Sequence, residues 1–354
     1  MTLAMLDEPG ASADAGGSEA IRRDGSPDAT DLLRLDAAAE VDRIGQAIRA
    51  QVLRRLRRRG AVVGLSGGID SSVTAALCAT ALGAQNVFAV FMPEKDSEAE
   101  SLRLGRLVAE QYGIRSVTED IAPALTAAGC YRRRDEFIRR LVPEFGPGWG
   151  CKVAITNALK NERFNLTMLV VQAPDGGQQK LRMPLDVYLG IVAATNMKQR
   201  TRKQIEYYHA DRLNYAVSGT PNRLEYDQGF FVKNGDGAAD FKPIAHLYKS
   251  QVYQLAEYLG IPEEIRRRPP TTDTWSLAQT QDEFYFSVPY RQMDLCLYGI
   301  DNALAAETVA RNAELTTEQV RAVWRDIEAK RRATRYLHES PLLVDPVVPL
   351  QPAT

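Results

Sequence analysis

AVVGLSGGIDSS, which occupies residues 61–72, decides the fold of this chain. Its first residues form a short apolar run with β-branched side chains, which stops at a serine and two glycines. Helix-forming residues follow from 71 to 82. This order predicts a buried strand, a tight glycine turn and the start of a helix.

The residues of the turn suit a bound phosphate. Gly67 and Gly68 let the backbone bend closely around an anion, and the hydroxyls of Ser66 and Ser71 can donate to its oxygens. The helix N-terminus adds free N–H groups and a positive dipole. Asp70 would repel a phosphate unless a magnesium ion lies between them. The turn therefore predicts a phosphate site with its own metal ligand.

This turn matches neither of the two common nucleotide motifs, G-x-x-x-x-G-K-[ST] and G-x-G-x-x-G. The string S-G-G-x-D-S resembles instead the pyrophosphate loop of the ATP pyrophosphatase (N-type) superfamily. Members of that superfamily cleave ATP between its α and β phosphates and leave AMP on an oxygen of the substrate. A glycine turn that joins strand to helix and binds nothing is the alternative.

Composition narrows the class of protein. The chain has 354 residues and a formal net charge of −1, so it has no electrostatic footprint for a nucleic-acid partner. Its 4 cysteines show no C-x-x-C spacing, which indicates reduced thiols and a cytoplasmic location rather than a zinc site or disulfides. No apolar run approaches the roughly 18 residues that span a membrane. We expect a disordered tail over residues 1–30 and a single domain over 31–354.

Strand and helix patterns alternate through the first half of the chain. Apolar strands are expected at 61–65, 86–92, 116–121 and 215–218, with helices at 35–59, 71–82, 97–112 and 186–213. The pattern predicts an α/β fold with a doubly wound parallel sheet, whose ligands bind beyond the carboxyl ends of the strands. The arginines between 54 and 59 favour a solvated helix end over a phosphate site.

The alternation breaks down between about residues 129 and 185. Two short strand patterns, at 164–172 and 179–183, flank Asp175-Gly176-Gly177, which is a hairpin signal. We interpret this region as an insertion that contains a hairpin, because it is too short to hold a large core of its own.

The second half of the chain carries a long loop, 219–247, and loops of this length are usually functional. A helix is expected at 249–259. The aromatic and proline-rich stretch after residue 274 does not suit a plain helix. Thr316 and Gln319 form a capping-box pattern at the start of a last helix.

Five sequence pieces, in this order, resemble the motifs of the NAD synthetase family. They are S-G-G-I-D-S-S; N-x-x-x-R-x-R (Asn196, Arg200, Arg202); G-T-x-x-x-x-E-x-x-x-G-F-F-x-K-x-G-D-G-x-x-D from residue 219; Lys249; and P-T-x-D around Thr271. The resemblance covers about residues 36–340 apart from the insertion. It implies a doubly wound sheet of the adenine nucleotide alpha hydrolase type, assembled as a homodimer. No glutaminase domain precedes the turn, so the implied type is ammonia-dependent.

The resemblance also implies roles for individual residues. By position, the ATP-binding residues would be Ser66, Gly67, Gly68, Asp70, Ser71, Arg200, Thr220, Lys249 and Thr271; the Mg²⁺ ligands Asp70 and Glu225; the acid-substrate residues Asn196, Lys233, Asp236 and Asp240; and the catalytic residues Asp70, Lys249, Asp236 and Lys233. Three plain alternatives stay open: Asp236 as a turn residue, Asp240 as a helix cap, and Lys249 as a solvated surface lysine.

The implied reaction is the ATP-dependent amidation of nicotinic acid adenine dinucleotide to NAD. It would proceed through an acyl-adenylate, release AMP and pyrophosphate, require Mg²⁺ and take ammonia as nitrogen donor, with a separate glutaminase as a candidate partner. The chain departs from the family at Pro221-Asn222, where Asp-His is usual, and at Tyr336-Leu337, where many members carry His-Lys. We expect these departures to fall on acid-substrate and interface positions rather than on the ATP loop.

Three other functions remain open. The departures allow a related adenylating amide ligase that acts on a different carboxylate. A tRNA sulfur transferase of the same superfamily would use the same loop, but paired catalytic cysteines and a basic surface are lacking. A nucleotide-binding module without catalysis is the third.

Overall fold

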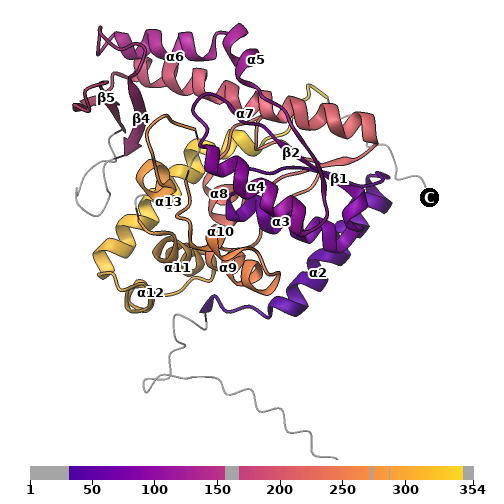
Figure 1. Ribbon diagram of the computed structural model, residues 1–354. Helices are drawn as coiled ribbons and strands as arrows, with labels where there is room; N and C mark the ends of the chain where they lie inside the picture. Colours follow the sequence, from indigo (N-terminus) through magenta and orange to yellow (C-terminus); the bar gives the residue numbers. More distant parts are fainter. Residues whose placement is uncertain (1–31, 156–166, 272–273, 287, 346–354) are drawn as a thin grey trace, which may run out of the picture.

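The computed structural model of the protein describes residues 32–155, 167–271, 274–286 and 288–345. The tail expected at 1–30 and the last residues, 346–354, lie outside this part. Figure 1 shows the arrangement of the elements. In chain order they are α2 (Ala37–Arg49), a π-helical turn (Ala50–Arg55), β1 (Ala61–Gly64), α3 (Ile69–Leu82), a 3₁₀ turn (Ala84–Asn86), β2 (Val87–Phe91), α4 (Ala99–Gln111), β3 (Arg115–Thr118), α5 (Ala122–Ala127), α6 (Cys130–Arg139), β4 (Gly150–Ile155), β5 (Thr167–Gln172), β6 (Gln178–Arg182), α7 (Leu185–Leu213), β7 (Ala216–Ser218), α8 (Arg223–Gln228), α9 (Lys249–Tyr258), α10 (Glu263–Arg267), a second π-helical turn (Asp282–Phe286), α11 (Tyr290–Asp301), α12 (Ala306–Ala313) and α13 (Thr317–His338).

The main sheet has the strand order β3-β2-β1-β7, and all of its pairs are parallel. Ala61 of β1 pairs with Val87 on one side and with Ala216 on the other. The chain leaves β1 toward β2 and β3, and it returns on the opposite side as β7. The strand order therefore reverses between β1 and β7, and ligands of open α/β sheets bind beyond the carboxyl ends at such a point.

Helices cover both faces of this sheet, which confirms the doubly wound fold. Neighbouring residues of β1 point to opposite faces, as in any strand. Val63 packs with residues of α2, α3, α4 and α9, such as Leu77 and Val252. Val62 packs instead with Val217 and with Ala210 of α7. In Figure 1, α3 and α4 accordingly lie on one side of β1 and β2, and α7 lies on the other.

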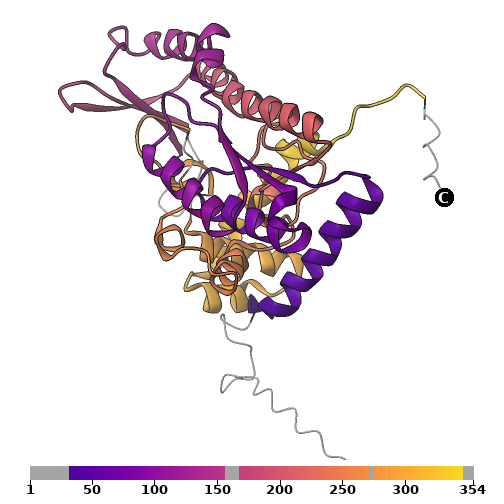
Figure 2. The same cartoon turned by 45° about the vertical axis from the view of Figure 1, so that its right-hand side comes forward.

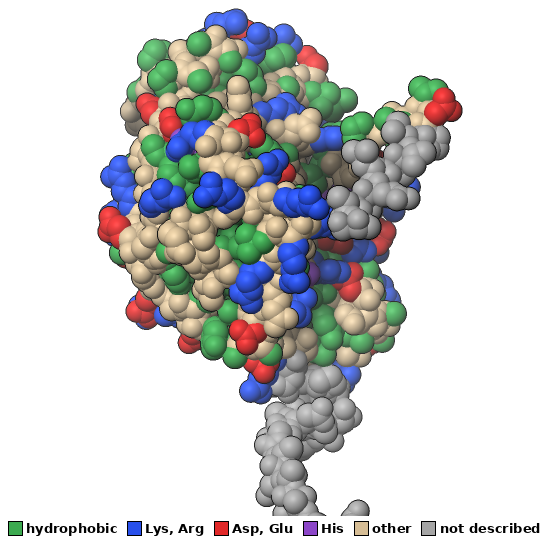
Figure 3. Space-filling model, turned by 90° about the vertical axis from the view of Figure 1, so that its right-hand side faces the viewer, with side chains coloured by type: hydrophobic (Ala, Val, Ile, Leu, Met, Phe, Trp, Pro, Cys, Tyr) green, Lys and Arg blue, Asp and Glu red, His purple; other side chains and the backbone are tan. Residues whose placement is uncertain are grey.

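The helix predicted at 35–59 is present as α2 and its π-helical extension. The exposed arginines at its end, residues 54–59, come just before β1. They therefore lie at the amino ends of the parallel strands, away from the Ser66 turn. Figure 3 shows this side of the molecule, where Lys and Arg side chains gather. The position supports a solvated helix end rather than a phosphate site.

The predicted hairpin is confirmed as β5 and β6, with Met168 opposite Arg182. The structure adds β4, which sequence patterns missed, and the three strands form an antiparallel sheet in the order β4-β5-β6. This inserted sheet packs on α6 and the start of α7 through Ile138, Val153 and Ile191. Figure 2 shows it beside the main body of the molecule.

The C-terminal part forms a helical layer with its own apolar core. The predicted capping box is confirmed, because Thr316 Oγ1 accepts from the Gln319 N–H at 3.2 Å and Gln319 Oε1 from the Thr316 N–H at 2.8 Å. Four helices of this part were not predicted, namely α8, α10, α11 and α12. α8 lies inside the predicted long loop, and α11 begins within the aromatic stretch after residue 274, which was predicted not to form a plain helix. In the described part of the chain, no helix is both long and apolar enough to cross a membrane.

Candidate active site

The Ser66 turn joins β1 to α3 and leaves the first N–H groups of α3 uncapped by a side chain. Ser71 Oγ lies 3.1 Å from Ser66 Oγ and donates to the Gly68 carbonyl at 3.0 Å. The two hydroxyls and the free N–H groups thus occupy one small region. Such a helix start binds anions through its unsatisfied donors and its dipole.

Gly67 is required by the backbone of this turn. Its φ is +75°, and a Cβ built there would lie 2.3 Å from the Ser101 carbonyl oxygen. This oxygen belongs to the backbone, so the clash cannot be relieved by the movement of a side chain. Gly68 is different, since its φ is −80° and a Cβ would lie 3.4 Å from Ser66 Oγ. Gly67 therefore lets the turn lie directly against the start of α4.

We expect Gly67→Ala to lower the free energy of unfolding by roughly 2 kcal/mol or more, because left-handed strain adds to the backbone clash. Gly68→Ala is the matched control and should cost much less. Urea unfolding of the two variants measures the difference. Equal losses would contradict this account of the turn.

A charged network joins the turn to three other segments. Asp70 accepts a short hydrogen bond from Lys249 Nζ at the start of α9, and its other oxygen accepts from Asn222 Nδ2 at 3.0 Å. Asn222 caps α8, and Glu225 Oε2 accepts from the Asn222 N–H at 3.1 Å. Gln281 Nε2 donates to Glu225 Oε1 at 3.0 Å. Asp70 and Glu225 are therefore held close together around Lys249.

The electrostatics of this network depend on burial. Lys249 is only 1% exposed. Burial alone would lower the pKa of Lys249, but the charges of Asp70 and Glu225 outweigh it and raise the pKa above its usual value. Burial, and then the negative charge of Asp70, raise the pKa of Glu225 to about 8. The two partly buried carboxylates, Asp70 and Glu225, therefore face a single buried positive charge, that of Lys249.

The residues present fit a magnesium ion. Mg²⁺ prefers oxygen ligands, and it is commonly held by one or two carboxylates together with substrate phosphates. Asp70 and Glu225 supply two carboxylates beside the phosphate turn. Among the described residues no group of three or more His, Cys, Asp or Glu could hold a metal. The donor set therefore suits a metal that arrives with a phosphate ligand.

The structure corrects one expectation about the departures from the family motif. Asn222 was expected at an acid-substrate or interface position, but its side chain donates directly to Asp70. The reason is that α8 begins at residue 223, so its N-cap is brought back to the turn. Tyr336 and Leu337, in contrast, line the cavity at the end of α13.

The residues predicted for the acid substrate surround the loop after α8. Lys233 Nζ donates to the carbonyls of Tyr336 and Glu339 at 2.7 and 3.0 Å, and Arg200 Nε donates to the Lys233 carbonyl at 3.2 Å. Asp236 Oδ1 accepts from a backbone N–H at 2.8 Å, and burial raises the pKa of Asp236. The loop, α7 and the end of α13 therefore meet here.

Asp240 is not part of this arrangement. Its Oδ2 accepts from the Val217 N–H of β7 at 2.7 Å, and its Oδ1 accepts from Tyr207 at 3.3 Å. The residue is exposed and does not line the cavity. Its carboxylate serves the backbone of β7, so the predicted contact with the acid substrate is not supported.

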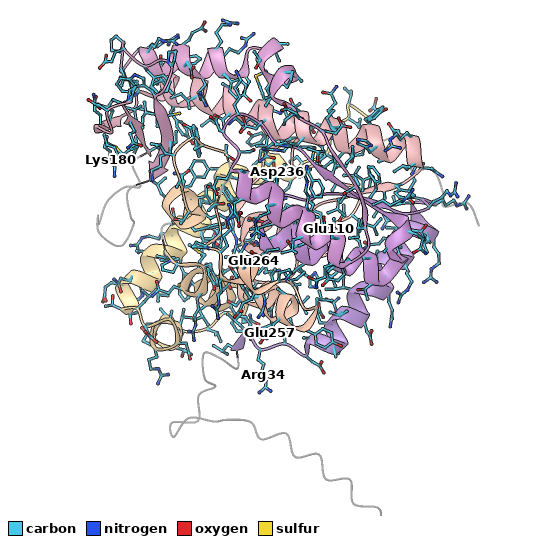
Figure 4. The ribbon with its side chains drawn as sticks, in the orientation of Figure 1. Arg34, Glu110, Lys180, Asp236, Glu257 and Glu264 are labelled. Carbon is cyan, nitrogen blue, oxygen red and sulfur yellow. The ribbon has the colours of Figure 1, made fainter. Side chains whose placement is uncertain are left out.

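One cavity of about 740 Å³ brings the other predicted residues together. It opens at the carboxyl ends of β1 and β7, and Figure 4 shows Asp236 within the molecule near this point. The predicted residues that line it are Ser66, Gly67, Gly68, Asp70, Ser71, Asn196, Arg200, Thr220, Glu225, Lys233, Asp236, Lys249 and Thr271.

Sequence patterns missed one residue that positions Lys249. Asp294 of α11 is fully buried, and its carboxylate accepts from the N–H groups of Lys249 and Ser250 at 3.1 and 2.7 Å. It also accepts from the Ser250 hydroxyl. Asp294 thereby caps α9 from a distant helix, alongside Gln251, whose Oε1 accepts from the Tyr248 N–H at 3.1 Å. No sequence signal marks it, because it lies 45 residues from Lys249 in the chain.

Comparisons with known proteins identify the family of the chain. The family model for NAD synthase matches residues 40–138 and 177–336. An NH(3)-dependent NAD(+) synthetase of Rhizobium rhizogenes is 69% identical over 318 residues, which cover 90% of this chain and 96% of the relative. Its counterpart in Rhizobium meliloti is 70% identical, with coverage of 90% and 95%. That of Thermotoga neapolitana is 33% identical, with coverage of 81% and 90%.

Solved structures share the fold. An NMN synthetase from Francisella tularensis superposes with a TM-score of 0.61 at 21% identity, covering 88% of this chain and 99% of that chain. An NH3-dependent NAD synthetase from Campylobacter jejuni gives 0.59 at 21% identity, covering 88% and 100%. Together with the family model and the close relatives, these findings settle the classification. The chain belongs to the NAD synthase family.

Proposed function

We propose that this protein catalyses the ATP-dependent amidation of nicotinic acid adenine dinucleotide to NAD, with ammonia as nitrogen donor and with AMP and pyrophosphate as products. Close relatives carry the name NH(3)-dependent NAD(+) synthetase over nearly their full length. The observation that carries the proposal is the placement of Asp70, Glu225 and Lys249 beside an uncapped helix start in one cavity.

The phosphate end of the cavity suits adenylate formation. A carboxylate does not accept ammonia, because its oxygen is a poor leaving group, and transfer of AMP to that oxygen removes the difficulty. Lys249 and the N–H groups of the Ser66 turn would stabilise negative charge on the departing pyrophosphate. Asp70 and Glu225 would hold Mg²⁺, which when bound supplies further positive charge against the phosphate oxygens.

The opposite end of the cavity would hold the acid. Asn196, Lys233 and Asp236 line it, and Arg200 fixes the backbone of Lys233. Ammonia would then attack the adenylated carbonyl carbon. The chain mainly positions the reactants and neutralises charge, so no nucleophilic serine or cysteine is required.

The raised pKa of Glu225 predicts a pH dependence. Its usual value is 4.5, and in the folded protein it is about 8. Between these values the folded state binds a proton that the unfolded state has released, so the stability of the metal-free protein falls as pH rises through this window. Mg²⁺ competes with that proton, so its binding should strengthen as pH rises toward 8, by up to about tenfold per pH unit.

Calorimetric titration of Mg²⁺ into the protein with a non-hydrolysable ATP analogue, from pH 6 to 9, measures this trend. Glu225→Gln should flatten it. A Mg²⁺ affinity that is independent of pH in the unsubstituted protein would contradict the assignment of Glu225.

The activity itself is tested with purified protein, ATP, Mg²⁺, ammonium and nicotinic acid adenine dinucleotide. We expect stoichiometric NAD, AMP and pyrophosphate. Release of ADP, or no product, would overturn the proposal.

Because Tyr336 and Leu337 line the cavity where the family usually carries His-Lys, a different carboxylate is the second candidate. A screen of carboxylates for ATP–pyrophosphate exchange separates the two.

We also propose the organisation of the working enzyme: one catalytic domain over residues 31–354 with an insertion at about 129–185, a homodimer, Mg²⁺ as cofactor and a cytoplasmic location. The family model spans both sides of the insertion and passes over residues 139–176. All four cysteines are free and buried, as reduced thiols would be. Light scattering of the purified protein tests the dimer.

A further inference from the structure

Residues 274–281, here called the docked segment, contact both Thr271 and Glu225 of the candidate site. Thr271, which lines the cavity, forms an isolated bridge with Thr280. The Gln281 N–H donates to the Pro270 carbonyl at 3.0 Å, and the Gln281 side chain donates to Glu225. The end of the docked segment therefore sets the place of one candidate phosphate contact and one candidate metal ligand.

The inserted sheet holds the docked segment along the edge strand β4. The Cys151 N–H donates to Ser276 Oγ at 2.9 Å, and the Leu277 N–H donates to the Cys151 carbonyl at 3.3 Å. Lys152 Nζ donates to the Ala278 carbonyl at 3.1 Å. Gln279 Nε2 donates to the Val153 carbonyl at 2.5 Å. The segment thus runs beside β4, at an edge to which no strand of the described residues is paired.

Lys198 of α7 fixes the beginning of the same segment. Its ammonium group is 1% exposed and donates to the Thr274 carbonyl at 2.7 Å, to Glu94 at 2.9 Å and to Asp96 at 2.6 Å. Arg134 of α6 donates to the same Asp96 oxygen, Oδ2, at 2.7 Å. A buried lysine with two carboxylates and a carbonyl has few alternative positions, because each lost partner would leave a buried charge.

The β4 side of these contacts lies outside the shared family pattern, whereas Lys198 and the docked segment lie within it. The family model passes over residues 139–176, which contain all of β4 and β5. Val153 and Ile155 of β4 also line the cavity. The insertion therefore contributes to the cavity wall and also contacts the docked segment, which reaches Glu225 through Gln281.

We propose that the inserted sheet and Lys198 position the docked segment, and through it Thr271 and Gln281, for the ATP and Mg²⁺ end of the cavity. Lys198, Ser276 and Gln279 are positioning residues on this account. The inference rests on the proposed function for the identity of the ligands, but the coupling between β4 and the segment is independent of the acid substrate.

The test compares Ser276→Ala and Lys198→Met with Lys180→Met. Lys180 is exposed on β6, at the far edge of the same sheet, and Figure 4 shows it pointing away from the molecule. In the first two variants, hydrogen exchange of residues 274–281 should rise about tenfold or more, as expected for a locally released segment. Lys180→Met should leave exchange there unchanged.

Kinetics add a readout that a general loss of stability would not give. The KM for ATP and the apparent Mg²⁺ affinity should each worsen about three- to tenfold in Ser276→Ala, with the KM for the acid unchanged, because only the phosphate end loses its support. Ser276→Thr keeps a hydroxyl, so its KM for ATP and its apparent Mg²⁺ affinity should match those of the unsubstituted protein. The melting temperature of Ser276→Ala should stay near that of the unsubstituted protein.

The proposal is overturned if exchange of residues 274–281 or the KM for ATP is unchanged in Ser276→Ala. Should Lys198→Met fail to fold, Ser276→Ala and Gln279→Leu decide the matter by the same two readouts. A failed proposed function would appear differently, as absence of NAD formation by the unsubstituted protein, and the exchange result would still stand.

Discussion

Asp70→Asn is expected to lower kcat by about 10³-fold or more, with a much smaller loss of nucleotide binding. The substitution keeps the shape of the side chain and its bond to Asn222, but it removes the negative charge beside Lys249 and Glu225. The N–H groups of the turn remain and can still hold phosphates. Steady-state NAD formation and calorimetric ATP titration measure the two effects separately.

A matched control for this variant is Asp186→Asn. Asp186 is exposed at the start of α7 and pairs with Arg140 at the surface, so kcat should not change. Full turnover in Asp70→Asn would show that the site does not need this carboxylate. A variant that loses ATP binding altogether would instead place the charge in recognition rather than in the reaction.

The second large effect is expected for Lys249→Met, with kcat lowered about 10²- to 10³-fold. Lys249 is the buried positive charge nearest to Asp70, and its position is fixed by the cap that Asp294 gives to α9. Methionine fills a similar volume without the charge. The negative charge that develops on the departing pyrophosphate would then lie near the carboxylates of Asp70 and Glu225 without the positive charge of Lys249 to stabilise it. Adenylation releases pyrophosphate, so the pre-steady-state burst of pyrophosphate shows whether the adenylation step is the one that slows.

The double variant Asp70→Asn with Lys249→Met is the internal check. Groups that act as a unit are not additive, so the double variant should lose little more than the worse single one. Multiplied losses would mean that the two side chains act independently. If Lys249→Met keeps a normal kcat and shows only a lower melting temperature, the lysine has a structural role and not a catalytic one.

The phosphate turn was predictable because its signals are contiguous in the chain. An apolar strand, two glycines and a helix start lie within residues 61–72, and the parallel sheet then determines where the turn must be. Thr220 could be placed near it for the same reason, since it follows β7, the strand next to β1. Here local pattern and topology together suffice.

The rest of the network could not be read from local pattern. Asn222 and Asp70 are 152 residues apart, and Asp294 lies on α11, within the aromatic stretch that was predicted not to form a plain helix. A single sequence does not show which distant polar groups meet. Asp240 is a different case, because a motif position implies a substrate contact, while its carboxylate accepts a hydrogen bond from the backbone of β7.

The two outer strands of the inserted sheet are shielded from other molecules in different ways. The free edge of β6 bears the exposed charges of Lys180 and Arg182, which disfavour the addition of a foreign strand. The one charged residue of β4, Lys152, donates to the Ala278 carbonyl, and the strand is covered by residues 274–281 instead. Release of that cover would bare unpaired backbone groups and invite aggregation. The contacts that orient the reaction therefore also protect the solubility of the folded chain.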